Sequence, residues 1–221
     1  MARLALRAVL WDMDGVLVDS HEAHFQAWAA TLAAEGIAFD RGIFLRLFGM
    51  NNRDTLASLL GRPPRAAELA RINQGKEGRF RRIIQGHARM LPGVSLWLER
   101  FRAAGYRQAV ASSAPLANIQ AIVEELGIAA FFDALVTSHG LAGKPDPAVF
   151  LAAAQQLAVA PAQCLVIEDS LAGVEAAGRA GMTCIAVQTT NPATALSAAT
   201  LTIPDLSYLT ETMIGALQGG D

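Results

Sequence analysis

Acidic, basic and hydroxyl side chains follow four of the short apolar runs in this 221-residue chain. In a doubly wound sheet, ligands bind at the carboxyl ends of the strands, so polar residues directly after apolar runs are site candidates. The candidates are Asp12, Asp14, Ser112, Ser113, Lys144, Glu168 and Asp169. Together they predict one crevice lined by four acids, one lysine and two hydroxyls.

This set of residue types favours one kind of chemistry. Four carboxylates in one crevice repel one another, and a single lysine does not offset their charge. A hard divalent cation does, and Mg²⁺ typically uses one or two carboxylates together with substrate phosphate and water. The same side chains supply a nucleophile, charge neutralisation and a proton donor, which phosphoryl transfer needs. The sequence therefore predicts a magnesium site used for phosphoryl transfer.

Each candidate also has a purely structural interpretation. Asp12 and Asp14 could be ordinary turn residues, because aspartate favours turns. Lys144 precedes a proline and could be a surface lysine. Ser112 could cap the helix that follows it, a role compatible with phosphate binding because helix N-termini attract anions. The second acidic pair, at the end of another apolar run, favours the functional interpretation.

The elements that would position these residues alternate between strands and helices, as in a parallel α/β sheet. The predicted strands are Leu6–Trp11, Arg107–Ala111, Ala134–Thr137, Cys164–Glu168, Thr183–Val187 and a last one near Leu201–Ile203. The predicted helices between them are Pro115–Leu126, Pro147–Leu157 and Leu171–Ala180. Gly127 and Gly181 stand where C-terminal glycines belong, and Asp146 stands as an N-cap before Pro147.

Residues 17–87 interrupt this alternation with helical patterns and no convincing strand. The predicted helices are His21–Glu35, Asn52–Leu60 and Arg65–Ile84, the last with a weak point at Gly75 or Gly78. We therefore predict an all-helical domain over residues 17–87. It is inserted into a doubly wound, Rossmann-like parallel core of residues 1–16 and 88–221. Val16–Ser20 and the stretch near Gly86–Pro92 are the expected hinges.

Composition excludes several other classes. Hydrophobic residues make up 52% of the chain and charged residues 17%, enough apolar content for a substantial core. The net charge of −2 and the lack of a basic cluster argue against nucleic acid as a partner. The first apolar residues are interrupted by Arg3 and Arg7, which favours a buried strand over a signal sequence. The sequence has no run of 18 apolar residues, so a membrane span is not expected. Cys164 and Cys184 lack metal-ligand spacing, so we expect both to be buried free thiols, which fit a reducing cytoplasm. A monomer is the default expectation for the oligomeric state.

Four segments closely resemble the motifs of the haloacid dehalogenase superfamily: DMDGVLVDS, VASSA, GKPDP and VIEDS. A lone Asp-x-Asp is a weak signal, but the four together are specific and span nearly the whole chain. The resemblance implies that Asp12 attacks phosphorus and becomes an aspartyl-phosphate. It implies that Asp14 protonates the leaving oxygen and then activates the acceptor. Asp14 favours phosphate chemistry over the dehalogenase branch, which does not need this second aspartate.

The resemblance also implies how phosphate and metal are held. Ser112 and Lys144 would hold the transferring phosphate, with Ser113 as a further phosphate-binding candidate. The implied Mg²⁺ ligands are Asp12, the main-chain carbonyl of Asp14, Asp169, and Glu168 either directly or through water.

The helical insertion resembles the cap domain of this superfamily, and its start, VDSHEAHFQAW, resembles the β-phosphoglucomutase-like branch. His24 and Trp28 fall where that branch places two residues facing the active site, and they share one helix face. Gly49 and Lys76 match a cap glycine and a cap lysine, and Asn52 is a candidate substrate contact. Alternatively, His24 is a packed side chain, Trp28 is cap core and Lys76 is a solvated charge. Lys76 is a poor candidate for the Schiff-base lysine of the phosphonate-cleaving branch.

Two departures from the mutase pattern concern the second phosphate. The arginine that the mutase carries after the cap glycine aligns with Asn52, and the adjacent Arg53 would point elsewhere. The lysine that follows its serine motif is also missing, because Ser113 is followed by Ala114, Pro115 and Leu116. We therefore expect a phosphatase of a small phosphorylated metabolite, such as a sugar phosphate, rather than a hexose-phosphate mutase. A non-catalytic metabolite-binding protein is the third alternative, disfavoured because every expected catalytic residue is present.

Overall fold

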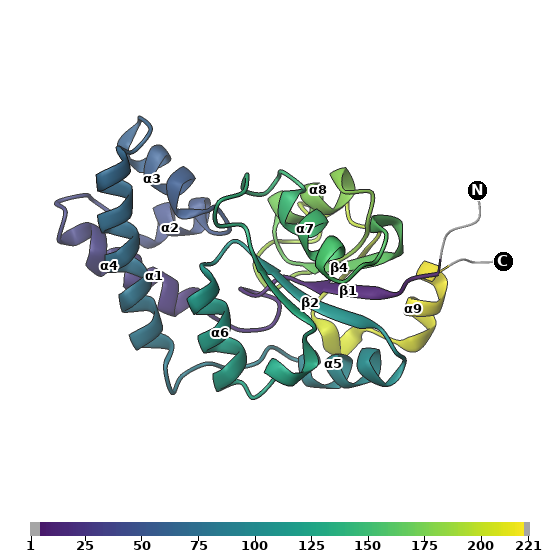
Figure 1. Ribbon diagram of the computed structural model, residues 1–221. Helices are drawn as coiled ribbons and strands as arrows, with labels where there is room; N and C mark the ends of the chain where they lie inside the picture. The colour runs from purple at the N-terminus through teal and green to yellow at the C-terminus, as the bar shows by residue number, and fades with distance from the viewer. Residues whose placement is uncertain (1–4, 219–221) are drawn as a thin grey trace.

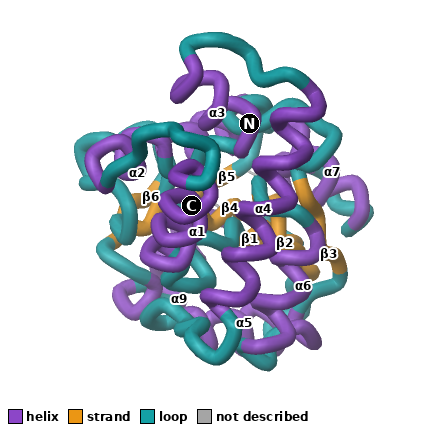
Figure 2. The backbone as a smooth tube through the Cα atoms, turned by 90° about the vertical axis from the view of Figure 1, so that its left-hand side faces the viewer, coloured by secondary structure: helices purple, strands orange, loops and turns teal. Residues whose placement is uncertain are grey.

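The computed structural model describes residues 5–218 and contains one six-stranded sheet (Figure 1). The strands are β1 (Ala8–Trp11), β2 (Arg107–Ser112), β3 (Ala134–Thr137), β4 (Cys164–Glu168), β5 (Thr183–Val187) and β6 (Leu201–Ile203). Every neighbouring pair is parallel, in the order β3-β2-β1-β4-β5-β6. Figure 2 shows this order across the sheet. This is the order of a doubly wound α/β fold, and the predicted fold class is confirmed.

The two faces of the sheet are covered by different helices. Along β1, Val9 and Trp11 pack on one side while Ala8 and Leu10 pack on the other, and all four are fully buried. This follows from the period of two in a strand. The first side is covered by α5 (Val94–Ala103), α6 (Leu116–Glu125) and α9 (Glu211–Gln218). The second is covered by α7 (Ala148–Gln156) and α8 (Leu171–Arg179).

Four helices between β1 and α5 lie to one side of the sheet, at the left of Figure 1. They are α1 (His21–Ala33), α2 (Arg41–Leu47), α3 (Asn52–Leu60) and α4 (Ala66–Ile84). They have a small apolar cluster of their own, made of Trp28, Leu32, Phe44, Leu56 and Ile72. We refer to α1–α4 as the helical unit. Its lack of strands, within the described residues, agrees with the predicted all-helical insertion.

The two chain segments that join the helical unit to the sheet run side by side. The Asp19 backbone N–H donates to the Arg89 carbonyl at 3.0 Å, and Val18 forms a β-bridge with Met90. The chain therefore leaves and re-enters the core at one place, as two adjacent hinges would require. Asp19 itself is exposed and serves this linker.

Several predicted element ends were wrong by one or two residues. β1 begins at Ala8 rather than Leu6. α7 begins at Ala148, and the Asp146 carboxylate accepts the Ala148 N–H from one position before the N-cap. α4 continues through Gly75 and Gly78 without a break. Each of these glycines costs about 1 kcal/mol, but the helix buries a whole apolar face.

Some helices were not predicted, whereas the glycines expected after two helices agree with the structure. The sequence patterns did not reveal α2, α5 and α9, or the short 3₁₀ helices Ala129–Phe131, Pro161–Gln163 and Leu206–Tyr208. Gly127 and Gly181 have φ values of 67° and 69°, as expected after helix ends. Among the described residues, no helix combines the length and apolar character that crossing a bilayer requires.

Candidate active site

Every residue predicted for the site lines one pocket between the carboxyl edge of the sheet and the helical unit. These residues are Asp12, Asp14, His24, Trp28, Gly49, Asn52, Lys76, Ser112, Ser113, Lys144, Glu168 and Asp169. They come from the carboxyl ends of β2 and β4, from the loops after β1, β2, β3 and β4, from α1, α3 and α4, and from the segment between α2 and α3. The parallel sheet therefore brings together side chains that are up to 157 residues apart in sequence.

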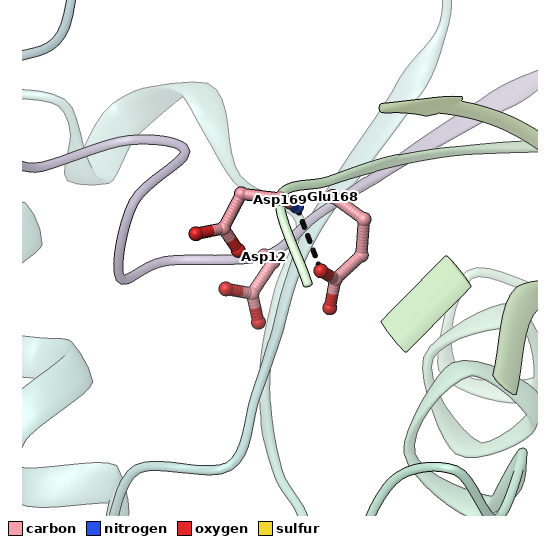
Figure 3. Close-up of side chains that lie close together, drawn as sticks. All are labelled: Asp12, Glu168 and Asp169. Carbon is pink, nitrogen blue, oxygen red and sulfur yellow. Dashed lines mark hydrogen bonds between the residues drawn. The ribbon is translucent and has the colours of Figure 1, made fainter. Parts of the chain in front are cut away.

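Three carboxylates form the floor of the pocket (Figure 3). Asp12 follows β1, while Glu168 and Asp169 lie at the end of the neighbouring strand β4. One oxygen from each lies within 4.8 Å of the others. The Asp12 N–H donates to the Ile167 carbonyl at 3.0 Å, which fixes the two strand ends beside each other. All three side chains are buried.

Lys144 is the cation at this floor. Its Nζ lies 2.6 Å from Asp12 Oδ1 and 2.7 Å from Glu168 Oε1, and it donates to the Ala111 carbonyl at 3.3 Å. Burial acts to lower the pKa of this ammonium, but the charges of Asp12 and Glu168 outweigh burial and raise it. Lys144 is a buried, charged floor residue, and the surface-lysine interpretation is wrong.

One lysine leaves the floor with excess negative charge. Burial raises the pKa of Asp12 to about 7. The positive charge of Lys144 acts to lower this pKa, and the negative charge of Glu168 acts to raise it. Burial, with the charges of Glu168 and Asp12, also raises the pKa of Asp169 well above its ordinary value. Carboxylates that resist ionisation because they are buried and lie close to one another are a fitting donor set for a hard divalent cation.

Glu168 is the most firmly held of the three acids. Its Oε2 accepts from the N–H groups of Asp169 (2.7 Å) and Ser170 (2.8 Å) and from the Ser170 hydroxyl (3.0 Å), while Oε1 accepts from Lys144. Burial opposes ionisation of Glu168, but Lys144 and these donors lower its pKa. With both oxygens engaged, Glu168 is better suited to reach a cation through water than directly.

Glycines make room for two of these carboxylates. A Cβ added at Gly173 would overlap the Glu168 carboxylate. A Cβ added at Gly15 would overlap the Asp169 carboxylate, and Gly15 also has a φ of 81°, which disfavours other residues. The turn after β1 and the start of α8 therefore both depend on glycine to admit the acids.

Asp14 lies at the same pocket but has different partners. Its Oδ1 accepts from the Ser20 hydroxyl at 2.5 Å and lies 3.0 Å from His24 Nε2. Burial acts to raise the pKa of Asp14, but His24 and Ser20 outweigh it and lower the pKa to about 2. The Asp14 carboxylate is therefore ionised at neutral pH, whereas Asp12 titrates near neutrality.

His24 connects Asp14 to Lys76. Lys76 Nζ lies 3.0 Å from His24 Nδ1, and a lysine ammonium has no acceptor, so Nδ1 accepts and Nε2 donates to Asp14. The His24 ring stacks on Phe80 at 4.0 Å between centroids. His24 is therefore both packed and turned to the pocket, and Lys76 is buried rather than solvated.

The remaining candidates lie at the walls. Ser112 is buried, and its hydroxyl accepts the Ala114 N–H at 3.1 Å, so it does not cap α6, whose N-cap is Pro115. Ser113 is half-buried beside it. Trp28 lines the pocket and also belongs to the apolar cluster of the helical unit. Its position is therefore compatible both with a residue facing the site and with a core residue of the helical unit.

The loop before α3 meets the core directly. Gly49 has a φ of 90°, and its position lies next to the Ser170 side chain. A Cβ at Gly143 would overlap the Asn51 amide, so the loop carrying Lys144 also touches this segment. Arg53 is exposed and does not line the pocket, as its place on the helix predicted.

Four polar residues at or behind the pocket were not predicted. Ser20 binds Asp14, and the Thr190 hydroxyl donates to Asp169. Glu77 accepts from Lys76 and Asn52, and Asn118 of α6 donates to Glu77. Only Glu77 carried a sequence signal, a charge next to Lys76, while the others depend on contacts between distant segments.

The cysteines and the remaining histidines are outside this pocket. Cys164 and Cys184 are buried free thiols in β4 and β5, and burial raises the pKa of Cys164 to about 11. His87 and His139 are exposed. Their structural interpretation agrees with these positions.

Several known proteins are similar to this chain in sequence. A family model described as haloacid dehalogenase-like hydrolase matches residues 6–181. β-Phosphoglucomutase from Bacillus subtilis is 35% identical over 190 residues, covering 82% of this chain and 83% of that protein. A phosphorylated carbohydrates phosphatase from Thermotoga maritima is 29% identical, covering 80% of this chain and 82% of that protein.

A solved structure extends the likeness to the fold. The β-phosphoglucomutase of Clostridium difficile superposes with a TM-score of 0.86 at 25% identity, covering 96% of this chain and 97% of that one. The likeness therefore includes the helical unit as well as the sheet.

Proposed function

The chain belongs to the haloacid dehalogenase-like hydrolases, in their β-phosphoglucomutase-like branch, and from this premise we propose a magnesium-dependent phosphatase. Its substrate is a small phosphorylated metabolite, of the sugar-phosphate class. The observation that carries the proposal is the pairing of two unlike aspartates at one pocket. Asp12 lies in the buried carboxylate–lysine floor, and Asp14 is an ionised carboxylate held by Ser20 and His24.

Asp12 is the proposed nucleophile. Lys144 holds its Oδ1, which leaves the other carboxylate oxygen to attack the phosphorus of the bound ester. The products of this step are an aspartyl-phosphate and the leaving alcohol. Lys144, Ser112 and Ser113 would hold the transferring phosphoryl group, whose developing charge the buried floor stabilises through its donors.

Asp14 is the proposed proton-transfer group. To act on the leaving oxygen, Asp14 must first take up a proton, which the negative charge of a bound phosphate beside it would favour. It gives this proton to the leaving oxygen and then, as a carboxylate, takes one from the water that attacks the aspartyl-phosphate. Its pKa of about 2 in this arrangement suits the second role. Proton transfer by a positioned group is typically worth about 10²–10⁴-fold in rate.

The proposed metal ligands are Asp12, Asp169 and the Asp14 carbonyl, with Glu168 through water. Mg²⁺ held there would neutralise charge on the phosphate and on the floor. The helical unit, residues 17–87, is the proposed cap over the core domain of residues 1–16 and 88–221. Its closure would exclude bulk water while admitting the one water that reacts. The buried thiols agree with a cytoplasmic setting, which stays a prediction, as does the monomer.

A phosphatase is favoured over a mutase by the charges around the pocket. Among its described lining residues there is no arginine, Asn52 is bound to Glu77, and the segment after the serine motif, Ser113 to Leu116, has no lysine. A mutase must hold a second phosphate during its cycle, and this wall lacks the free cations for that task. The mutase remains the alternative because a relative of that name is 35% identical.

The test is phosphate release from a panel of phosphorylated sugars and alcohols, with Mg²⁺ and with EDTA. We expect release in Mg²⁺, none in EDTA, and none from Asp12→Asn. The matched control is Asp19→Asn, an exposed aspartate in the adjoining linker, which should retain wild-type rates. Isomerisation of a sugar phosphate stimulated by its bisphosphate, without net phosphate release, would establish the mutase instead. Binding without either reaction would leave the non-catalytic alternative.

A further inference from the structure

Lys76 is the cation of the helical unit that lines the pocket, and its charge is already paired. Its Nζ lies 2.9 Å from Glu77 Oε1, and both side chains are buried, with exposed fractions of 3% and 6%. Its other polar contact is His24 Nδ1, at 3.0 Å. A buried ammonium that has a carboxylate partner gives little net attraction to a further anion.

Glu77 is held in place from three sides. Besides Lys76, Oε1 accepts from the Asn52 amide at 2.7 Å, and Oε2 accepts from the Asn118 amide at 2.5 Å. The Asn118 amide is itself oriented by Arg81, which donates to its Oδ1 at 2.7 Å. Burial opposes ionisation of Glu77, but Lys76 and the Asn52 amide lower its pKa, so Glu77 carries a negative charge at neutral pH. The carboxylate is thus a fixed part of the pocket wall.

The rest of the wall offers no free positive charge. Among the described lining residues, the second lysine is Lys144, which is bound to Asp12 and Glu168, and there is no arginine. The acids of the lining outnumber its lysines: Asp12, Asp14, Glu77, Glu168 and Asp169 against Lys76 and Lys144.

Part of the pocket lining is apolar. Phe48 and Met50 come from the segment between α2 and α3, and Pro115 comes from the start of α6. Phe48 is half-buried and Met50 is 48% exposed, so both present surface to an occupant. Such a surface suits the C–H face of a neutral group and penalises the burial of a charge.

We propose that Glu77, by pairing with Lys76 in this apolar-walled pocket, makes the protein selective for substrates with a single phosphate on an uncharged leaving group. This inference rests on the proposed phosphatase function and names the substrate class of that site. Lys76 retains a donor for a neutral hydroxyl, because an ammonium has three N–H groups and its two polar partners use two. A leaving group bearing a second phosphate or a carboxylate meets Glu77 instead of a free cation.

Two matched substrate pairs test the selectivity. Fructose 1-phosphate is compared with fructose 1,6-bisphosphate, and glycerol 1-phosphate with 3-phosphoglycerate, each by kcat/KM for phosphate release in Mg²⁺. Within each pair the substrates differ in the charge of the leaving group. We expect kcat/KM for the neutral member to be higher by about tenfold or more. Repulsion between one charge on the substrate and one carboxylate in a partly buried site is sufficient for a factor of about ten.

Glu77→Gln tests the residue. It removes the charge and keeps an oxygen for Lys76, so we expect the neutral-to-anionic ratio of kcat/KM to fall about tenfold. The ratio is the readout because a general loss of fold or of cap closure lowers both members equally. The control is Glu68→Gln, which removes a half-buried charge from the first turn of the same helix, away from the pocket lining, and should leave the ratio unchanged. If Glu77→Gln does not fold, Met50→Lys serves, because it adds an unpaired ammonium to the wall and leaves Glu77 intact.

The inference is overturned if the wild type releases phosphate from the anionic members as well as from the neutral ones. It is also overturned if the ratio does not change in Glu77→Gln, or in Met50→Lys where that variant replaces it. These outcomes differ from failure of the proposed function, which is the lack of Asp12-dependent phosphate release from every member of both pairs.

Discussion

Replacing Lys144 by methionine tests whether the carboxylate floor depends on its one cation. The change keeps an unbranched side chain of similar length and removes contacts of 2.6 Å to Asp12 and 2.7 Å to Glu168. Hydrogen bonds to charged groups contribute about 1.5–3 kcal/mol each, and breaking a buried pair costs about 3–5 kcal/mol. Both routes give a loss of about 4 kcal/mol in the free energy of unfolding. For a chain of this size that is a fall of roughly 8–16 °C in Tm.

The loss should depend on pH and on Mg²⁺. Without Lys144, burial and mutual repulsion hold the pKa values of Asp12 and Glu168 above those of the unfolded chain. The penalty then grows as pH rises above the unfolded pKa near 4, so it is small at pH 5 and full at pH 8. Mg²⁺ supplies the missing positive charge, so the variant should gain more stability from Mg²⁺ than the wild type does.

The assay is denaturant unfolding at pH 5 and pH 8, in EDTA and in Mg²⁺. Arg179→Met is the matched control, because its pair with Glu175 is exposed and such pairs contribute at most about 1 kcal/mol. A Lys144→Met protein as stable as the wild type at pH 8 in EDTA would refute the view that the floor holds uncompensated charge.

Three further predictions concern the floor and the helical unit. Gly173→Ala should weaken Mg²⁺ binding in titration calorimetry, because its Cβ displaces Glu168; Gly178→Ala, with open space at the same helix, should not. The Mg²⁺ affinity of the wild type should rise at least about tenfold per pH unit as pH increases towards 7, because protons on Asp12, with a pKa of about 7, and on Asp169, whose pKa is also raised, compete with the metal; a flat profile would contradict this. Asn118→Ala should lower the free energy of unfolding by about 1–3 kcal/mol, since it leaves a buried acceptor on α4 unpaired, and an unchanged denaturation midpoint would contradict that role.

The residues of the floor were predictable because their signal is local. A polar residue after an apolar run marks a strand end, and parallel strands place their carboxyl ends at one edge, so Asp12, Lys144 and Glu168 had to converge once the sheet was recognised. The glycines Gly127 and Gly181 were equally readable, because a positive φ after a helix is a property of one residue.

Helix ends and some whole helices were less predictable. α5 has no side-chain N-cap to mark its start, and both α5 and α9 depend on packing an apolar face against the sheet. Gly75 and Gly78 weaken α4 locally, yet the burial of Ile72, Phe80 and Ile84 keeps it continuous. Local propensity is a small term beside these contacts.

The amino-acid sequence alone determined the fold class, the family and the carboxylate–lysine floor, because each is written in residues whose meaning does not depend on distant partners. Only the tertiary structure decided what the pocket wall does. Glu77 and Asn118 are 41 residues apart in the chain and belong to different units, and their contact exists because α4 lies against α6. Whether the charge of Lys76 is paired could not be judged from the sequence, although Glu77 is the next residue. The carboxylate is fixed against Lys76 by its hydrogen bonds with Asn52 and Asn118, which only the fold provides.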